Sequence, residues 1–367
     1  MTKKIRIIGA AAVALVWLAL TAFAWFGPKE DISDSERRKL AQFPEFNTRT
    51  VLSGKFMSDF EDYTLDQFPL RDSFRQLKAR IHYDLLRQGD NNGIYIADGY
   101  AAKLEYPLNQ MSVDKAVTKF NSIYENYLKD TESKVFLTVI PDKGYYLAEE
   151  NGYPAMDYEA LFETVRTGMP WAEFVDVTEL LDIGDYYRTD THWRQEEILD
   201  VAQRLCEALG ISVPQEREFT RKAVERPFWG VYYGQAALPM EAETIWVMES
   251  ETLAGCTVYN YETGKTTSIY DMDKLDSRDL YDVYLSGASA LLTIENPNAS
   301  SDRELIVFRD SFGSSLVPLL AADYASVTMV DIRYISSDIL GQFIDFHGQD
   351  VLFAYSTLVL NDSSTMK

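Results

Sequence analysis

The chain has 367 residues, of which 46% are hydrophobic, so it is long enough to bury the core of one large domain or two smaller ones. It carries 35 basic and 57 acidic residues, which gives a formal net charge of −22. This acidic balance argues against a nucleic-acid partner, because phosphate binding needs a basic surface. It also means that any membrane attachment has to come from a discrete segment.

Residues 7–26, IIGAAAVALVWLALTAFAWF, form such a segment, because the run contains no charged residue. At about 1.5 Å per residue it is roughly as long as the hydrocarbon core of a bilayer is thick. Basic residues precede it, which predicts a cytoplasmic N-terminus and an extracytoplasmic body. Residues 1–26 are therefore expected to be a single-pass signal anchor in the cell membrane. Cleavage after Ala24, which would remove residues 1–24 and release a secreted protein, stays open.

Residues 27–88 are predicted to be a juxtamembrane linker followed by a helical lead segment. The linker, up to residue 52, is polar and weakly patterned. In the helical part, apolar residues recur at three- and four-residue spacing and share one helix face: Phe74, Leu77, Ile81 and Leu85.

Residues 89–367 are predicted to form one α/β domain. Short apolar runs typical of buried strands occur at 134–140, 173–177, 305–308, 327–330 and 351–355. Helical patterns separate several of them, at 194–209, around 316–320 and around 339–346. This alternation favours a mainly parallel sheet covered on both faces. Residues 213–300 break the rhythm and are interpreted as a long excursion with antiparallel strands of its own.

Cys206 and Cys256 are the only cysteines in the sequence. An exported protein can carry a disulfide, but the sequence does not determine whether these two residues pair. Cys206 lies on the periodic helix 194–209, which favours a buried thiol.

The segment RDSFGSS (309–315) is the first candidate for chemistry, since ligands collect at the carboxyl ends of strands in open parallel sheets. An apolar strand stops, the chain turns at Ser311, and a helix begins. A serine here points out of the sheet, and backbone N–H groups at the helix start can stabilise an oxyanion. The logic is that of a nucleophile elbow, although the G-x-S-x-G pattern is absent.

A serine nucleophile needs a base, which is usually a histidine oriented by a carboxylate. The chain has three histidines. His82 lies on the early helix, and His347 precedes the last strand, at the opposite end of the sheet from Ser311. His192 remains, and Asp190 is close enough in sequence to reach its ring.

Helix capping is an alternative explanation for both segments. Serine at a helix start is often an N-cap, and Asp190 or Thr191 can equally cap the helix 194–209. Spacing alone leaves the choice open.

A metal site is a further alternative, because Asp190-x-His192 with Asp310 offers possible ligands. Such sites usually draw on several histidines with supporting carboxylates, and no histidine-rich or cysteine-rich cluster occurs in the sequence. We therefore predict neither a metal nor another cofactor.

The sequence resembles the bacterial DHHW protein family, whose namesake motif is present as TDTHW (189–193). Thr191 stands where the family has its first histidine. This position lies between Asp190 and His192, so the difference from the family leaves both of these residues in place. The resemblance also covers SERRKLAQFPEF (35–46), DQFPLRD (66–72), NNGIYIADGY (91–100), RPFWGVYYGQAALP (226–239), DLYDVYLSG (279–287), ELIVFRDSFGSSLVPLL (304–320) and VTMVDIRYI (327–335).

DHHW proteins in turn resemble the SGNH-hydrolase-like domains of exported polysaccharide O-acetyltransferases, such as those that act on alginate. This implies an SGNH-hydrolase-like three-layer α/β fold with a mainly parallel central sheet. It also implies that Ser311 is the nucleophile, His192 the general base and acid, and Asp190 its orienting carboxylate. The Ser311 N–H is expected to be one oxyanion donor. Gly287 is a weaker candidate for another contribution, and for this residue the role of a simple turn glycine stays open.

Three further residues are expected to line a groove for the acceptor sugar: Lys143 and Tyr145 in PDKGYY, and Trp193. For Trp193, a packing role stays open as well.

The implied activity is acyl transfer to cell-surface or secreted polysaccharide through an acyl-enzyme. If a sugar hydroxyl takes the acyl group the protein is a transferase, and if water does it is an esterase. An exported domain has no ready access to cytoplasmic acetyl-CoA, so a transferase needs a membrane partner that delivers the acyl group. The resemblance implies that this partner is a membrane-bound O-acyltransferase. The alternative is a non-catalytic glycan-binding or assembly protein that keeps the fold.

Overall fold

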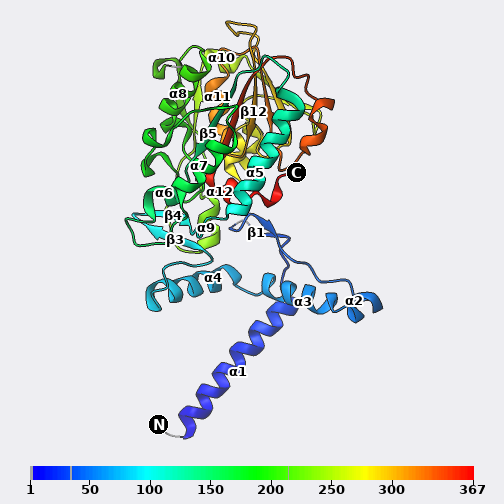
Figure 1. Cartoon of the computed structure of the whole chain (residues 1–367). Coiled ribbons are helices and arrows are strands. Elements are labelled where there is room, and N and C mark those ends of the chain that lie inside the picture. Colours follow the sequence, from blue (N-terminus) through cyan, green and yellow to red (C-terminus); the bar gives the residue numbers. More distant parts are fainter. Residues whose placement is uncertain (1–2, 34, 214) are drawn as a thin grey trace. The chain divides into compact units, whose positions relative to one another are not determined.

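The computed structural model describes residues 3–33, 35–213 and 215–367. The chain forms two compact units (Figure 1). The first comprises Met1–Asn92 and Tyr233–Pro239, and the second comprises Gly93–Tyr232 and Met240–Lys367.

The first unit begins with the apolar helix α1 (Lys3–Phe26). Its stretch Lys4–Phe26 has a mean hydropathy of 2.3 and is long and apolar enough to cross a membrane. The elements that follow are short: β1 (Ile32–Ser33), β2 (Arg38–Lys39), α2 (Thr48–Leu52), α3 (Lys55–Asp66) and α4 (Arg71–Arg80), which continues as the π-helical turn η1 (Ile81–Leu85). The predicted helical lead segment thus contains α3 and α4, separated at Gln67–Leu70 next to Pro69, while α2 lies in the predicted linker.

The second unit is built on a sheet that has eight strands within the described residues, in the order β10-β9-β11-β13-β12-β14-β5-β6. Five strands run parallel: β5 (Val135–Ile140), β6 (Glu173–Phe174), β12 (Glu304–Arg309), β13 (Ser326–Val330) and β14 (Asp350–Ser356). Three strands extend it in antiparallel fashion: β9 (Thr257–Asn260), β10 (Lys265–Thr267) and β11 (Leu291–Glu295). Two antiparallel pairs lie outside the sheet: the hairpin of β3 (Ile94–Ala97) with β4 (Tyr100–Lys103), and β7 (Thr220–Ala223) with β8 (Trp246–Glu249), which a long connection joins.

Helices cover both faces of this sheet, which confirms the predicted three-layer α/β architecture (Figure 1). On one face, α8 (Leu199–Leu209) and α11 (Gly313–Leu320) pack against alternate strand residues such as Val307 and Leu352. On the other, α5 (Gln110–Ile123) and α7 (Tyr158–Gly168) pack against Ile306 and Phe353. The remaining helices are short: α6 (Lys143–Leu147), α9 (Val231–Ala236), α10 (Glu251–Ala254) and α12 (Thr357–Asn361).

Some predicted elements differ in the structure. The strand expected at 173–177 is only the two-residue edge strand β6, because it pairs on one side alone. Of the antiparallel strands predicted in the excursion, β7 and β8 form a separate pair, whereas β9, β10 and β11 join the main sheet. The helix expected at 194–209 begins at Leu199, after a short 3₁₀ turn at Gln195–Glu197.

Both cysteines are buried free thiols, so Cys206 and Cys256 form no disulfide. Burial raises the pKa of the Cys206 thiol to about 12 and that of Cys256 to about 11. Neither thiol is therefore reactive at neutral pH.

Candidate active site

Ser311 lies in the tight turn between β12 and α11, where the sequence predicts a nucleophile elbow. The buried carboxylate of Asp310 holds this turn. Its Oδ1 accepts a hydrogen bond from the N–H of Phe312 at 3.0 Å, and its Oδ2 accepts one from the N–H of Ser356 at 2.7 Å. Since Ser356 ends β14, Asp310 ties the turn to the neighbouring strand. Both of its oxygens are engaged, which explains its position without a metal.

His192 and Asp190 lie on a turn closed by a hydrogen bond from the N–H of Tyr187 to the carbonyl of His192, at 3.1 Å. Asp190 Oδ1 is 2.6 Å from His192 Nδ1, and His192 Nε2 is 2.8 Å from Ser311 Oγ. In the tautomer with its proton on Nδ1, the imidazole donates to the carboxylate and accepts from the serine hydroxyl. The structure therefore brings together the three residues that the sequence singled out, across a separation of 119 residues.

The Asp190 carboxylate is almost completely buried, with an exposed fraction of 1%. Its Oδ2 accepts a hydrogen bond from the N–H of Val231 at 2.8 Å. Next to it, the N–H of Gly230 donates to Thr189 Oγ1 at 2.9 Å. The segment at the start of α9 thus fixes the carboxylate on the side opposite the histidine.

Thr191, where the DHHW family has a histidine, is turned away from this chain of hydrogen bonds. Its Oγ1 accepts a hydrogen bond from the hydroxyl of Tyr232 at 3.0 Å. The substitution therefore changes a contact with α9 and leaves the Asp190–His192 pair intact.

Tyr281 is a site residue that reasoning from the sequence missed. Its ring stacks on the His192 imidazole, with centroids 3.9 Å apart and planes 6° apart. Its hydroxyl donates to Ser315 Oγ at 2.8 Å. Burial raises the pKa of Tyr281 well above its ordinary value, so it stays protonated as that donor. The only sequence signal was its place in DLYDVYLSG, one of the stretches that resemble the DHHW family.

Trp193 does not line a groove, because its side chain is completely buried. Its Nε1–H donates to Ser315 Oγ at 2.9 Å and to the carbonyl of Phe312 at 3.2 Å. The packing interpretation of this residue therefore fits the structure, and the groove-lining one does not. Trp193 and Tyr281 therefore both donate a hydrogen bond to the hydroxyl of Ser315.

Lys143 is also buried, with an exposed fraction of 2%, so the expected contact with an acceptor sugar is wrong. Its ammonium donates to the carbonyl of Tyr187 at 2.9 Å and lies 5.0 Å from the ring centre of Tyr232. Burial lowers the pKa of Lys143 to about 7, although the negative charges of Asp190 and Glu243 oppose this shift. The turn after β5 directs the side chain inward, where it holds the segment that leads to Asp190.

Gly287 has a positive φ of 87°, which suits glycine in a turn. A Cβ atom there would lie 2.3 Å from a carboxylate oxygen of Asp282. Its N–H already donates to the carbonyl of Tyr284 at 3.1 Å, so it is not available to an oxyanion. The expected contribution of Gly287 to an oxyanion site is thus not supported.

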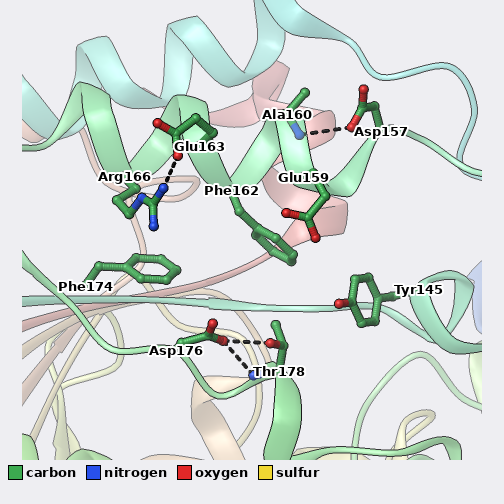
Figure 2. A pocket seen from close by; sticks show the side chains of 10 residues that line it. All are labelled: Tyr145, Asp157, Glu159, Ala160, Phe162, Glu163, Arg166, Phe174, Asp176 and Thr178. Atoms are coloured by element: carbon green, nitrogen blue, oxygen red, sulfur yellow. Dashed lines mark hydrogen bonds and ion pairs between the residues drawn. The ribbon is translucent and has the colours of Figure 1, made fainter.

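Tyr145 does line a cavity, of about 500 Å³, between α6, α7 and the segment after β6 (Figure 2). Across residues 3–33, 35–213 and 215–367, no group of three or more His, Cys, Asp or Glu side chains is arranged to hold a metal ion.

Comparison with known families gives a match between residues 181–330 and the model of the DHHW protein family. This segment contains Asp190, His192 and Ser311. Comparison with curated proteins gives no match.

Among solved structures, a DHHW family protein from Eubacterium siraeum is similar at a TM-score of 0.62 and 22% identity, over 75% of this chain and 94% of that one. PatB1 of Bacillus cereus with a sulfonyl adduct is similar at a TM-score of 0.58 and 18% identity, over 73% and 95% of the two chains. The O-acetyltransferase domain of Pseudomonas putida AlgJ aligns at a TM-score of 0.45 and 14% identity, over 73% and 92%.

At these identities, the first two likenesses establish a shared fold. Together with the match over 181–330, they confirm the predicted resemblance: the chain resembles the DHHW proteins in sequence around its Asp-His-Ser site and shares their α/β fold over three quarters of its length.

Proposed function

We propose that this protein is an extracytoplasmic O-acyltransferase or esterase that modifies polysaccharide through an acyl-enzyme on Ser311. The observation that carries the proposal is the hydrogen-bonded chain from the buried Asp190 through His192 to the partly exposed Ser311. Helix capping does not account for it, because no side-chain cap is formed by Ser311 at α11 or by Asp190 at α8. α1 is the proposed membrane anchor.

In the first half-reaction, Ser311 Oγ attacks the carbonyl carbon of an acyl ester while His192 Nε2 accepts the hydroxyl proton. The tetrahedral intermediate collapses, the donor's alkoxide leaves, and His192 returns the proton to it. The product is an ester on Ser311. Asp190 keeps the imidazole in the reactive tautomer and stabilises its positive charge.

In the second half-reaction, a sugar hydroxyl attacks the acyl-serine and gives its proton to His192. Ser311 Oγ then leaves and takes that proton back, so the site is restored. If water attacks instead, the same steps give hydrolysis. The outcome depends on how well the site holds a sugar and excludes water.

The Ser311 N–H is the proposed oxyanion donor. This N–H makes no hydrogen bond to any described residue. It belongs to the turn that immediately precedes α11. A preorganised N–H at this position stabilises the negative oxygen of the tetrahedral intermediate. The positive end of the helix dipole of α11 adds to this effect.

The first half-reaction needs a donor of the acyl group on the outer side of the membrane. We propose that a membrane-bound O-acyltransferase delivers the acyl group and that α1 keeps the α/β unit near it. The PatB1 structure with a sulfonyl adduct suggests a practical probe, since sulfonyl reagents capture activated nucleophiles.

The test uses the detergent-solubilised full chain with p-nitrophenyl acetate, followed by mass spectrometry of the peptide that contains Ser311. Acetylation of Ser311 that disappears in Ser311→Ala and His192→Ala is expected. An unmodified Ser311 in a chain with native circular dichroism and melting would contradict the enzymatic proposal. A non-catalytic, glycan-binding role would then be the better explanation. If Ser311 is acetylated as expected, adding a polysaccharide acceptor to the acetylated enzyme distinguishes transfer from hydrolysis.

A further inference from the structure

The cavity that Tyr145 lines lies within the second unit and is separate from the Asp190–His192–Ser311 chain (Figure 2). It has a volume of about 500 Å³, enough for a saccharide unit or two. Its walls are Tyr145, Asp157, Glu159, Ala160, Phe162, Glu163, Arg166, Phe174, Asp176 and Thr178.

Three half-buried aromatic rings form the apolar part of this wall: Tyr145, Phe162 and Phe174. The rings of Tyr145 and Phe162 lie 6.0 Å apart with planes inclined by 62°, so they present surfaces of different orientation. Aromatic faces of this kind stack on the apolar faces of sugar rings. They also attract a cation.

The polar part of the wall is acidic. It holds four carboxylates and one guanidinium, and that guanidinium, Arg166, is already paired with Glu163. Among the described residues, the carboxylate of Glu159 has no hydrogen-bond or ion-pair partner. Asp176 uses Oδ1 to accept from the N–H and the hydroxyl of Thr178, at 2.9 and 2.7 Å, and its Oδ2 is not engaged by these bonds. Figure 2 shows the two residues on opposite sides of the cavity, Glu159 on α7 and Asp176 on the segment after β6.

Part of the cavity lies at the same edge of the sheet as Ser311. Tyr145 follows the carboxyl end of β5, at the edge of the sheet where Ser311 follows β12, whereas Phe174 pairs with Leu137 part-way along β5. The strands β12 and β6 are three places apart in the sheet, which corresponds to roughly 14 Å. A polysaccharide segment of a few units is long enough to span this lateral spacing of the strands.

We propose that the cavity binds a protonated amino-sugar unit of the acceptor polysaccharide, a few units from the one that receives the acyl group. The ammonium would lie between Glu159 and Asp176 while the sugar ring stacks on the aromatic wall. This inference rests on the proposed function and narrows its substrate class. A polymer of uronic acids is disfavoured, because its carboxylates would face those of the cavity.

The test measures binding by isothermal titration calorimetry, with the full chain in detergent and tetramers of glucosamine, N-acetylglucosamine and guluronate. We expect the glucosamine tetramer to bind at least about tenfold more tightly than the N-acetylated one, and less tightly as salt is raised. The guluronate tetramer should give no heat. Equal binding of the two hexosamine tetramers, or preferential binding of guluronate, would overturn the proposal.

The double variant Glu159→Gln/Asp176→Asn should weaken binding of the glucosamine tetramer about fivefold to tenfold. The matched control Glu207→Gln/Asp302→Asn removes the same charge from exposed positions outside the cavity and should leave binding unchanged. An equal loss in both double variants would show a general charge effect and contradict a site.

Ser311→Ala should bind the glucosamine tetramer as the wild type does, since binding does not require the nucleophile. Binding without acetylation of Ser311 would therefore refute the enzymatic proposal and leave the cavity's ligand standing. Acetylation of Ser311 without selective binding of the glucosamine tetramer would support the enzymatic proposal and refute the proposed ligand of the cavity.

Discussion

Gly230 and Asp190 are in such close contact that a Cβ atom on the glycine would lie 2.2 Å from both Cα and Cβ of the aspartate. No side chain fits there unless the backbone of one segment moves. The proposed orienting carboxylate therefore owes its position to a glycine 40 residues later in the sequence, in the stretch RPFWGVYYGQAALP.

The variant Gly230→Ala should lose about 10²-fold or more in the rate of Ser311 acetylation, because displacement of Asp190 by about 1 Å misaligns the imidazole. Gly264→Ala is the control: its φ is also unusual, at +66°, but it has open space around it. It should cost about 1–2 kcal/mol in unfolding free energy without a change in rate. Equal rates for the two variants would contradict this account of Gly230.

Asp190→Asn should keep the fold but lower the rate of acetylation by about 10⁴-fold, as in other Ser-His-Asp sites, since the amide no longer holds the imidazole in the reactive tautomer. The N–H of Val231 still finds an oxygen acceptor, which preserves the local structure. The rate with p-nitrophenyl acetate and the melting temperature together check this expectation. A loss of activity that only follows a loss of folded protein would speak for a structural role instead.

Tyr281 is expected to act as a positioning residue for His192. Tyr281→Phe keeps the stacked ring and loses the hydrogen bond to Ser315, so it should cost about 1 kcal/mol in unfolding free energy and change the rate only a fewfold. Tyr281→Leu removes the stacked face and should lower kcat about tenfold to a hundredfold with little effect on KM. If both variants behave alike, the stacking has no part in orienting the imidazole.

Lys143 predicts a pH dependence of stability. Because its pKa falls from 10.5 to about 7 on folding, the cost of burying its charge is fully present below pH 7. As pH rises from 7 towards 10.5, the folded state gives up the proton that the unfolded state keeps, so stability should rise. The increase is at most about 1.4 kcal/mol per pH unit. Urea unfolding of the wild type and Lys143→Met at several pH values isolates this contribution in the difference, and parallel curves would contradict it.

The alternation of apolar strands and helices made the α/β class readable from sequence, because strands such as 134–140 and 351–355 are buried on both faces. The periodicity of apolar residues gave a wrong prediction where tertiary packing determines the local structure. The pattern around 339–346 predicted a helix, but the segment forms only the short 3₁₀ helix Ser337–Gln342, followed by a turn before β14. Elimination among three histidines sufficed to choose His192, since the exposed His347 lies near Glu304 at the start of β12, away from Ser311.

The directions in which the side chains of the site residues point could not be predicted from the sequence. Lys143 and Trp193 are polar or amphipathic residues at loop positions, where exposure is the ordinary expectation. Their burial depends on contacts with Tyr187 and Phe312, which come from other segments of the chain. The stacking of Tyr281 on His192 joins residues 89 positions apart, and no local pattern encodes such a pair.

The hydrogen bond from Ser356 to Asp310 has a consequence for timing. Asp190 and His192 are made long before Ser311, yet the turn that presents the serine is braced by a strand close to the end of the chain. β12 is also flanked by β13 and β14, both of which follow it in sequence. In a growing chain, the proposed base and the proposed nucleophile thus stay unassembled until β14 has been made and has joined the sheet. We therefore expect any reactivity of Ser311 to appear only once β14 has joined the sheet, and a fragment that ends before β14 to show none.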